Sequence, residues 1–403
     1  VKHGWAFKGE YFAEDGEQSI LTPGNFFEKG GFKPNNGKER YYTGTYPKEY
    51  LCHKGDLIVA MTQQAEGLLG STALVPENNK YLHNQRIGLI TCDEKRLNKL
   101  FAYYLFMTKS VREQLERSSS GTKVKHTSPE KIYDVEVEIP DVISQQKIAN
   151  LLWSIDEKIA NNNAINDNLE QQAKLLYNYW FIQFNFPDEN GNPYHSSGGQ
   201  LVWNKNLQQE IPQDWRSGNL YDIADYINGI ACQKYRPSDE EHSLPVVKIR
   251  EMNGGITNDT ERVSSTIPAK NIISSGDILF SWSASLEVIM WYGVDAGLNQ
   301  HIFKVVPKSY FSSEYVYLQL SEYLIHFIKI AEARKTTMGH ITSEHLQDSH
   351  IILPPANIIK NFSEYVRPIY QMKKQIANET SELIKLRDWL IPMLMNGQAT
   401  ISD

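Results

Sequence analysis

The sequence of 403 residues contains only three cysteines, Cys52, Cys92 and Cys232, which are too few and too scattered for a disulfide framework or a CxxC metal site. It contains no apolar run of about 20 residues, the length that a membrane-spanning helix needs. The start, Val1 to Gly4, lacks the basic and then apolar pattern of a secretion signal. We therefore expect a protein of the reducing cytoplasm.

The sequence also lacks an excess of positive charge. It has 41 Lys and Arg residues against 48 Asp and Glu residues, which gives a net charge of −7. A protein that binds nucleic acid through its overall charge carries a basic surplus instead. Any nucleic-acid role must therefore use local patches or partner proteins. The composition is otherwise that of a folded protein, and the length predicts about two to four domains.

Catalytic motifs are missing as well, since no GxxxxGK[ST], GxSxG or HExxH string occurs. Pro140-Asp141 followed by Asp156-Glu157-Lys158 resembles the string of a metal nuclease, but the second part falls on a predicted helix rather than on a strand beside Asp141. Asn192-Pro193-Tyr194 lacks the second proline of a methyltransferase motif. Three histidines at intervals of five are expected to be polar loop residues rather than metal ligands: His340, His345 and His350. The sequence thus predicts no catalytic residue and no metal site.

What the sequence does contain is a long internal repeat. Residues 126–140 match residues 340–354 without a gap, and both segments begin with histidine and end with proline. Four further matches precede this one in the same order: Gly4-Trp5 with Gly229-Ile230, Gly30-Gly31 with Gly254-Gly255, Gly55-Asp56 with Gly276-Asp277, and Asn84-Gln85 with Asn299-Gln300. The fixed order of five matches predicts a duplicated domain.

The second copy has a segment from Trp215 to Asp225 ahead of its Gly229, and nothing comparable precedes Gly4. We therefore expect about 15 or more residues ahead of Val1 in the full protein. In each copy, short β-branched and aromatic runs such as 276–282 and 302–306 predict strands, and 97–115 and 313–333 predict helices. The expected class is α+β.

After Pro140 and Pro354 the apolar period becomes helical, with alternating spacings of four and three that predict paired helices. A helix over about 142–182 would be about 60 Å long. The apolar residues expected to pair the two helices are Ile148, Leu152, Ile155, Ile159, Leu169 and Leu176 in the first, and Phe362, Val366, Ile369, Ile376, Leu383 and Leu390 in the second. Asn162 and Asn166 interrupt the first seam, either to fix the register of the pair or because they are solvated where the helices splay.

These patterns divide the chain into five parts. The expected bounds are 1–140 for the first domain, 141–185 for a central helix, 186–213 for a turn-rich linker, 214–354 for the second domain and 355–403 for the C-terminal helix.

Basic and amide side chains on the loops of both domains are candidates for contacts with phosphates and base edges. In the first domain they are Lys33, Asn35, Asn36, Lys38, Arg40, Gln85, Arg86, Lys123, Lys125 and His126. In the second domain they are Lys234, Arg236, Lys248, Arg250, Gln300, His301 and His340.

The sequence resembles the specificity subunits of type I restriction-modification systems over essentially its whole length. The features that carry the resemblance are the two similar domains each followed by a long helix, the strands that begin at Gly55-Asp56 and Gly276-Asp277, and the Asn-Gln pairs at 84 and 299. Further segments that carry it are Ile139-Pro140 with Gln145-Gln146-Lys147-Ile148, Leu353-Pro354-Pro355, and the linker from Pro193 to Gly199. The second copy departs from the pattern, because Ile358-Ile359-Lys360 stands where the first has the two glutamines.

The resemblance implies two homologous, strand-rich target recognition domains separated by two long antiparallel helices that form a coiled coil. Each domain would read one half of a split sequence in double-stranded DNA, and the helices would set the spacer between the halves. The resemblance also implies a non-catalytic chain without a cofactor of its own. Methyltransferase subunits with S-adenosylmethionine, and restriction subunits with ATP and Mg²⁺, would supply the chemistry.

Two other functions stay open. The chain could be a scaffold that joins protein partners without reading DNA, since amphipathic helices also serve protein docking. It could instead be a self-contained methyltransferase or nuclease, against which the missing motifs count.

Overall fold

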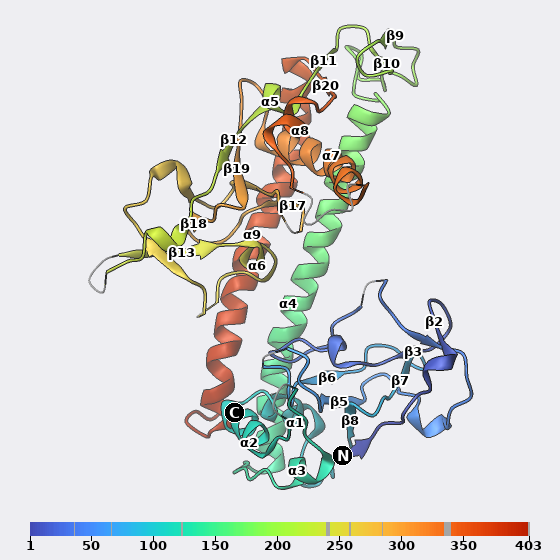
Figure 1. Cartoon of the computed structure of the whole chain (residues 1–403), viewed down its shortest axis with the longest axis vertical. Coiled ribbons are helices and arrows are strands. Elements are labelled where there is room, and N and C mark those ends of the chain that lie inside the picture. The colour runs from blue at the N-terminus through green and yellow to red at the C-terminus, as the bar shows by residue number, and fades with distance from the viewer. Residues whose placement is uncertain are drawn as a thin grey trace. The chain divides into compact units, whose positions relative to one another are not determined.

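The computed structural model describes residues 1–35, 37–65, 67–121, 124–238, 242–257, 259–283, 285–333 and 340–401. Two of the candidate DNA-binding residues, Asn36 and Lys123, lie outside the described residues. The chain forms two compact units (Figure 1). The first unit is residues 1–160 with 382–403, and the second unit is residues 161–381.

The globular part of the first unit contains two four-stranded sheets and three short helices. One sheet has the order β1-β8-β5-β6 and the other β2-β4-β3-β7. The strands are β1 (Lys2–His3), β2 (Phe12–Ala13), β3 (Ser19–Ile20), β4 (Tyr41–Tyr42), β5 (Leu57–Ala60), β6 (Thr72–Leu74), β7 (Tyr81–Leu82) and β8 (Ile87–Ile90). The helices are α1 (Lys99–Leu105), α2 (Lys109–Ser118) and α3 (Pro129–Tyr133). The central strand β5 is buried along its whole length, because its four residues are all apolar.

The second unit repeats this plan with the sheets β12-β19-β16-β17 and β14-β13-β18-β15. Each unit contains a parallel strand pair, β3 with β7 and β13 with β18, among otherwise antiparallel strands. The strands are β11 (Arg216–Gly218), β12 (Ala224–Asn228), β13 (Ser243–Val247), β14 (Arg262–Ser264), β15 (Ile272–Ile273), β16 (Ile278–Ser281), β17 (Glu287–Met290), β18 (Ala296–Leu298), β19 (Ile302–Pro307) and β20 (Ile351–Leu353). The helices are α5 (Leu220–Ile223), α6 (Ile249–Gly254), α7 (Ser313–Ala333) and α8 (Ser343–Gln347). The predicted duplication is thus present as a repeated topology.

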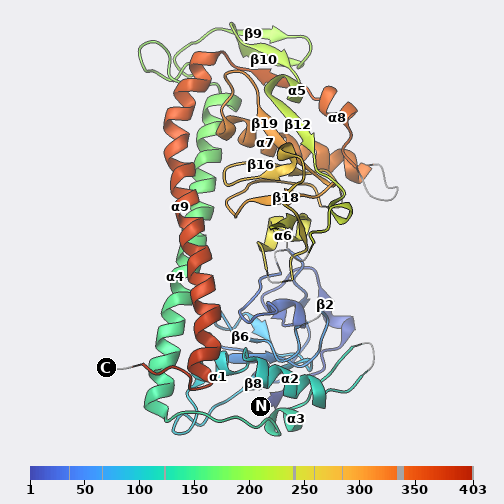
Figure 2. The same ribbon diagram turned by 90° about the vertical axis from the view of Figure 1, so that its left-hand side faces the viewer.

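Two long helices, α4 (Val142–Tyr177) and α9 (Ala356–Met395), run through the chain, and a π-helical turn (Asn178–Ile182) extends α4. Asp141 accepts the first backbone N–H groups of α4 and so caps its start. The side chain of Asp156 contacts Arg387 in the first unit, and Glu170 contacts Lys373 in the second, so the two helices are antiparallel (Figure 2). The predicted α+β class with two strand-rich domains and an antiparallel helix pair is confirmed.

The seam of the helix pair is buried as its spacing predicts. Ile148, Leu152 and the neighbouring end of α9 join the core of the first unit, which contains Phe101 and Tyr104 of α1. Phe362 and Val366 join the core of the second unit. The other seam residues are buried or half-buried: Ile155, Ile159, Leu169, Leu176, Ile369, Ile376, Leu383 and Leu390. The helices therefore extend the two domain cores instead of standing apart from them.

Asn162 is not solvated, which overturns one of the two alternatives for this residue. Its side chain is 1 % exposed, and Nδ2 donates to Thr380 Oγ1 (3.2 Å) and to Glu379 Oε2 (2.9 Å) on α9. A buried amide with partners on the facing helix favours one register over its neighbours, because any shift would leave it unpaired.

Two other sequence predictions need correction. The predicted helix over 97–115 is two helices, because the chain turns at Phe106: the Thr108 hydroxyl donates to the Leu105 carbonyl (2.7 Å), and Arg112 Nε donates to the Phe106 carbonyl (2.6 Å). The turn-rich segment 186–213 contains a hairpin of β9 (Leu201–Asn204) and β10 (Gln209–Pro212). Both segments have polar side chains that bond locally, which the apolar period alone does not reveal.

Candidate nucleic-acid interface

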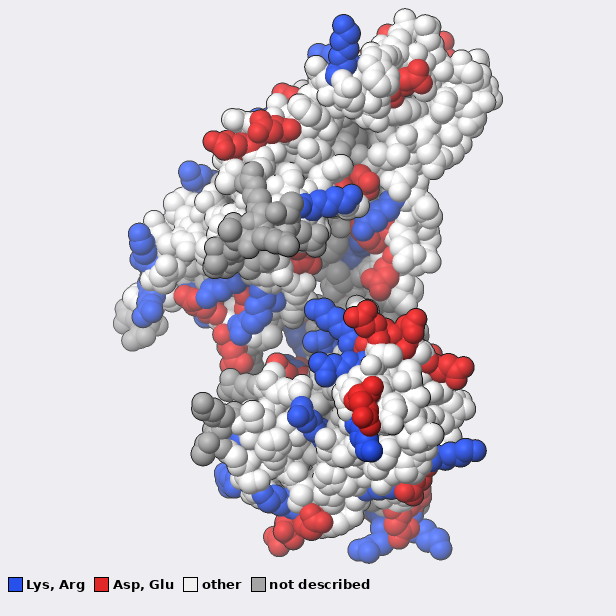
Figure 3. Space-filling view, turned by 45° about the vertical axis from the view of Figure 1, so that its right-hand side comes forward, with Lys and Arg blue, Asp and Glu red and all other residues white. Residues whose placement is uncertain are grey.

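The surface charge is mixed. Figure 3 shows basic and acidic side chains interspersed on the visible face, in agreement with the net charge of −7. A site for a polyanion must therefore be sought in cations that lack acidic neighbours.

Three segments meet at the same place in each unit, and we call this place the turn cluster. In the first unit it comprises the residues after β5 (61–64), the Asn-Gln turn (84–86) and the histidine segment (126–127). The N–H of Met61 donates to the Arg86 carbonyl (2.9 Å), and the N–H of Thr127 donates to the Met61 carbonyl (2.9 Å). Two backbone bonds thus hold the three segments together.

The second unit builds its turn cluster with equivalent bonds. The N–H of Trp282, which follows β16, donates to the His301 carbonyl (3.3 Å), and the N–H of Ile341 donates to the Trp282 carbonyl (3.0 Å). The segments are those that the sequence repeat pairs with the first unit. These two backbone hydrogen bonds are therefore common to both units, whereas several of the side chains differ.

Glycine is required beside both turns. A Cβ atom at Gly4 would lie 2.1 Å from the Asn84 carbonyl oxygen, and one at Gly229 would lie 2.1 Å from the Asn299 carbonyl oxygen. Each glycine lets its own segment approach the Asn-Gln turn, where Trp5 forms an isolated parallel bridge with Asn84 and Ile230 forms one with Asn299. The repeated glycine and the repeated asparagine are therefore contact partners in each unit: Gly4 packs against Asn84, and Gly229 packs against Asn299.

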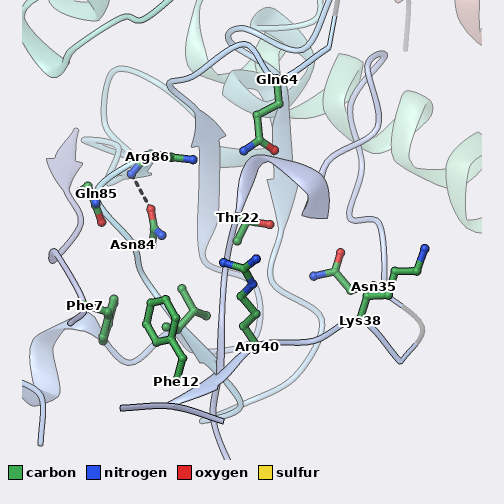
Figure 4. A pocket seen from close by; sticks show the side chains of 11 residues that line it. Phe7, Phe12, Thr22, Asn35, Lys38, Arg40, Gln64, Asn84, Gln85 and Arg86 are labelled. Atoms are coloured by element: carbon green, nitrogen blue, oxygen red, sulfur yellow. Dashed lines mark hydrogen bonds between the residues drawn. The ribbon is translucent and has the colours of Figure 1, made fainter. Parts of the chain in front are cut away.

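The turn cluster of the first unit opens into a hollow of about 500 Å³. Its lining has an apolar side with two phenylalanines and a polar side with amides and cations (Figure 4). Gln64 and Arg40 point toward its middle from opposite sides in this view. The lining residues are Phe7, Phe12, Ile20, Thr22, Asn35, Lys38, Arg40, Gln64, Asn84, Gln85 and Arg86. Five candidates from two segments thus come together here: Asn35, Lys38 and Arg40 from the loop before β4, and Gln85 and Arg86 from the Asn-Gln turn.

The cations of this hollow are available to a ligand. Within the described residues, Lys38, Arg40 and Arg86 make no side-chain hydrogen bond or ion pair, and all three are exposed. Lys33 lies apart from the lining, with its ammonium 5.8 Å from the ring centre of Phe27. The first unit therefore gathers three free cations at one place.

Two further candidates of the first unit have partners. Lys125 forms an ion pair with Glu116, and His126 Nδ1 lies 3.0 Å from Thr62 Oγ1. Their contact with DNA stays a prediction, and a ligand would have to compete with these partners.

The turn cluster of the second unit carries aromatic side chains instead. The half-buried indole of Trp282 lies 5.6 Å from the ring of His301 and 5.6 Å from the ring of His340. Its Nε1 donates to Asn228 Oδ1 (3.2 Å), and Gln300 Nε2 lies 3.3 Å from His301 Nε2. Two candidates, His301 and His340, thus flank one tryptophan, and a third, Gln300, lies against His301.

The cations of the second unit divide into two pairs. Lys248 forms an ion pair with Glu261, and Arg250 contacts Glu251, which is 2 % exposed. Lys234 and Arg236 are exposed. Two of the four candidate cations of the second unit, Lys248 and Arg250, therefore form ion pairs with carboxylates of the same unit.

Sequence reasoning missed several residues of these clusters. Gln64, Phe12 and Thr22 line the hollow, and Trp282 and Asn228 complete the aromatic group. Trp282 ends a strand that the sequence predicts, and Gln64 lies just beyond another one. A search of the residues directly after each central strand would have found both.

One buried histidine lies beside the first turn cluster. His83 is fully buried, and Nε2 bonds the Ile87 carbonyl (2.7 Å), while Nδ1 has no partner among the described residues. Burial lowers its pKa to about 4, although the bond to Ile87 opposes the shift. His83 is therefore neutral at pH 7.

No group of three or more histidine, cysteine, aspartate or glutamate side chains among the described residues is placed to hold a metal ion. No helix in the same ranges is both long and apolar enough to span a bilayer.

The fold and its two turn clusters define a class of protein: a duplicated α+β domain joined by paired helices, with loops that present polar side chains. The family description "Type I restriction modification DNA specificity domain" matches the chain twice, at residues 1–171 and 212–386. The chain belongs to this family.

Curated relatives agree with this assignment. The chain is 25 % identical over 317 residues to the type I restriction enzyme MjaIX specificity subunit of Methanocaldococcus jannaschii, covering 75 % of this chain and 69 % of the relative. It is 22 % identical to the HindI specificity subunit of Haemophilus influenzae, with coverages of 74 % and 77 %. It is 21 % identical to the EcoBI specificity subunit of Escherichia coli, with coverages of 99 % and 84 %.

A solved structure has the same fold. The type I restriction-modification S subunit from M. genitalium superposes with a TM-score of 0.54 at 16 % identity, over 100 % of this chain and 94 % of that one.

Proposed function

We propose that this chain is the subunit of a type I restriction-modification complex that recognises the DNA sequence. Each unit reads one half of a split target, and the paired helices set the spacer between the halves. The observation that carries this proposal is the repeated turn cluster: one backbone frame occurs twice and presents different exposed polar side chains each time. Such an arrangement suits two readers of two different half-sites.

The side chains of the first turn cluster match the chemistry of base edges. Arginine can form two parallel hydrogen bonds to guanine, and asparagine or glutamine can do so to adenine. Arg40, Arg86, Asn35, Gln64 and Gln85 supply these groups around one hollow.

Catalysis belongs to partner subunits in this proposal. The chain itself holds no cofactor, modification subunits bring S-adenosylmethionine, restriction subunits bring ATP and Mg²⁺, and the complex acts in the cytoplasm. Asp156, which belongs to the nuclease-like string, forms an ion pair with Arg387 and accepts a hydrogen bond from the hydroxyl of Tyr104 instead. Their role is structural.

The helix pair is the proposed docking surface for the modification subunits. In the second unit, apolar side chains one or two heptads apart face solvent. They are Ile165 on α4, Tyr179 on the π-helical turn that extends α4, and Tyr365 and Met372 on α9. Apolar residues at this spacing are typical of helices that pack against further helices. A helical partner segment fits them.

The first test is the methylation pattern of the source cell with and without the gene. We expect one split motif to lose methylation when the gene is deleted and to regain it on complementation. A pattern that stays unchanged in cells that express the partner subunits would contradict the proposal and favour the protein scaffold.

A second test addresses the spacer. Matched insertions of about four residues, roughly one helical turn, after Ala160 in α4 and after Ser381 in α9 lengthen the two helices by the same amount. We expect the methylated motif to keep both half-sites and to change its spacer. An unchanged spacer in a folded and active variant would reject the role of the helices as a ruler.

The net charge gives a third expectation. Phosphate neutralisation supplies most non-specific DNA affinity, so a chain with a net charge of −7 should bind DNA weakly by itself. Nanomolar binding by the purified chain at physiological salt would contradict this.

A further inference from the structure

We infer that Arg86 in the first unit and His301 in the second are equivalent specificity-determining residues, each of which sets the base preference at one position of its half-site. The inference rests on the proposed function and deepens it. It assigns a guanine contact to Arg86 and a weaker, single contact to His301.

The backbone makes the two residues equivalent. The carbonyl of each accepts a hydrogen bond from the residue after the central strand, Met61 or Trp282. The N–H of Arg86 donates to Asn84 Oδ1 (2.7 Å), and the N–H of His301 donates to Asn299 Oδ1 (3.4 Å). Both residues therefore leave the same turn from the same position.

A comparison of the two turns indicates which side chain can distinguish one base from another. Asn84 and Asn299 are identical, and their side-chain oxygens hold the turn itself. Gln85 and Gln300 are also identical, so the residue type at this position does not distinguish the two units. The third position is the first at which the two turns differ, so the turns can read different bases only there.

Arg86 is free to contact a base. Its guanidinium is exposed, lines the hollow beside Gln85, and makes no hydrogen bond or ion pair within the described part of the chain. A guanidinium can donate two parallel hydrogen bonds to O6 and N7 of guanine, which no other base accepts in the same way. Arg86 therefore predicts a guanine in the first half-site.

His301 cannot make this contact. An imidazole presents one nitrogen at a time to a base edge, so it forms a single hydrogen bond. The ring is also held between Trp282 (5.6 Å) and the amide of Gln300 (3.3 Å). We therefore expect weaker discrimination at the equivalent position of the second half-site.

The test is a reciprocal exchange, Arg86→His and His301→Arg, in the full chain assembled with its methyltransferase subunits. Methylation of duplexes in which each half-site is randomised in turn gives the base preference at every position. Arg117→His and His350→Arg are matched controls, because both residues are exposed and lie outside the turn clusters. Arg117 contacts only Glu113 among the described residues.

Arg86→His should lower the preference for guanine at one position of the first half-site by roughly tenfold or more, with the second half-site unchanged. His301→Arg should raise the preference for guanine at one position of the second half-site. The controls should leave the motif as it is.

Unchanged half-sites in both exchange variants would overturn the inference while the proposed function stands. Methylation of no split target by the wild-type complex would overturn the proposed function itself. If Arg86→His abolishes methylation, competition binding with duplexes that differ at single positions replaces it as the readout. A uniform loss of binding to all of these duplexes would then show a phosphate contact and would reject the base-reading role.

Discussion

The two units share a backbone plan and differ in what they place on it. In the first, three free cations and several amides surround a hollow, whereas in the second, two histidines flank a tryptophan and two candidate cations pair with carboxylates. The backbone bonds that hold the turn clusters do not depend on these side chains. The exposed side chains can therefore change while the backbone stays the same. Proteins of one family that recognise different DNA targets require this property.

The units also attach to the helix pair in a comparable way. In the first, Asp156 of α4 accepts from Tyr104 of α1 (2.6 Å) and from Arg387 of α9 (2.9 Å). In the second, Glu170 of α4 accepts from Tyr317 of α7 (3.1 Å) and pairs with Lys373 of α9. One carboxylate in each unit thus ties the domain to both helices.

The largest effect is expected from the glycines that the shared frame requires. Gly4→Ala and Gly229→Ala each place a methyl group against a backbone carbonyl, and we expect each to cost more than about 3 kcal/mol in its own unit. Hydrogen exchange of β8 and β19 measures the loss separately for each unit.

Gly9→Ala and Gly254→Ala are the matched controls, because a Cβ atom at either position meets no atom within 4 Å. Equal losses at Gly4 and Gly229 would support a common frame. A tolerated alanine at one of them would show that the two turns differ in their packing.

The two carboxylate bridges should differ in strength. Glu170→Ala leaves the ammonium of Lys373, 13 % exposed, without its carboxylate and should cost about 2 to 3 kcal/mol. Asp156→Ala should cost about 1 to 2 kcal/mol, since Arg387 keeps Asp388 as a partner at 2.7 Å. Urea unfolding followed by hydrogen exchange in each unit measures both losses.

Glu170→Gln is the control, because the amide oxygen still accepts from Tyr317 while the charge is lost. A larger loss for Asp156→Ala than for Glu170→Ala would contradict the ranking. It would mean that the buried hydroxyl of Tyr104 depends on its partner more than Lys373 does.

Much of the fold could be predicted from the sequence, for physical reasons that particular residues illustrate. The spacing from Ile148 to Ile159 marks a helix face because apolar residues recur with the helical period. The duplication is visible because Gly229 and Asn299 repeat a required contact. The break at Phe106 was missed because its cause is a side chain, Arg112, that bonds backbone carbonyls across a turn.

The sequence predicted which loop residues are candidates for the site, but it did not predict which of these loops lie next to each other. Arg40 and Gln85 are far apart in the sequence, and their segments come together because β3 pairs both with β4, which follows Arg40, and with β7, which precedes Gln85. The apolar period predicts which face of a helix or strand is buried. It does not predict which loops lie next to each other, because this depends on the order of the strands in the sheet. The same limit explains why Gln64 and Trp282 were missed.

The pH should separate the two units. Because burial lowers the pKa of His83 to about 4, against about 6.5 in an unfolded chain, the unfolded state takes up a proton first as the pH falls. The first unit should therefore lose stability below about pH 6.5, by about 2 kcal/mol at pH 5. Leu298 occupies the equivalent position of the second unit, which lacks this dependence.

Hydrogen exchange at pH 7 and pH 5, corrected for intrinsic rates, measures β5 and β8 against β16 and β19. His83→Leu should remove the difference between the units, whereas His53→Gln, at an exposed position, should not. Equal acid sensitivity of the two units in the wild-type chain would contradict the assignment to His83.

The smallest effect concerns the seam, whose predicted residues on α4 are apolar in the first unit, whereas Asn162 and Asn166 interrupt it in the second. Asn162→Ala removes two hydrogen bonds to α9 and should cost only about 1 kcal/mol, because Glu379 can turn to water. Asn162→Leu restores an apolar seam and should match or exceed the wild-type stability, but it removes the group that favours one register. Ile155→Leu, in the first unit, is the control for a change of shape without a change of polarity. Disulfide trapping between α4 and α9 reports the register of the helix pair. If the Asn162→Leu variant is trapped in a single register, as the wild type is expected to be, the shape of the seam alone fixes the register.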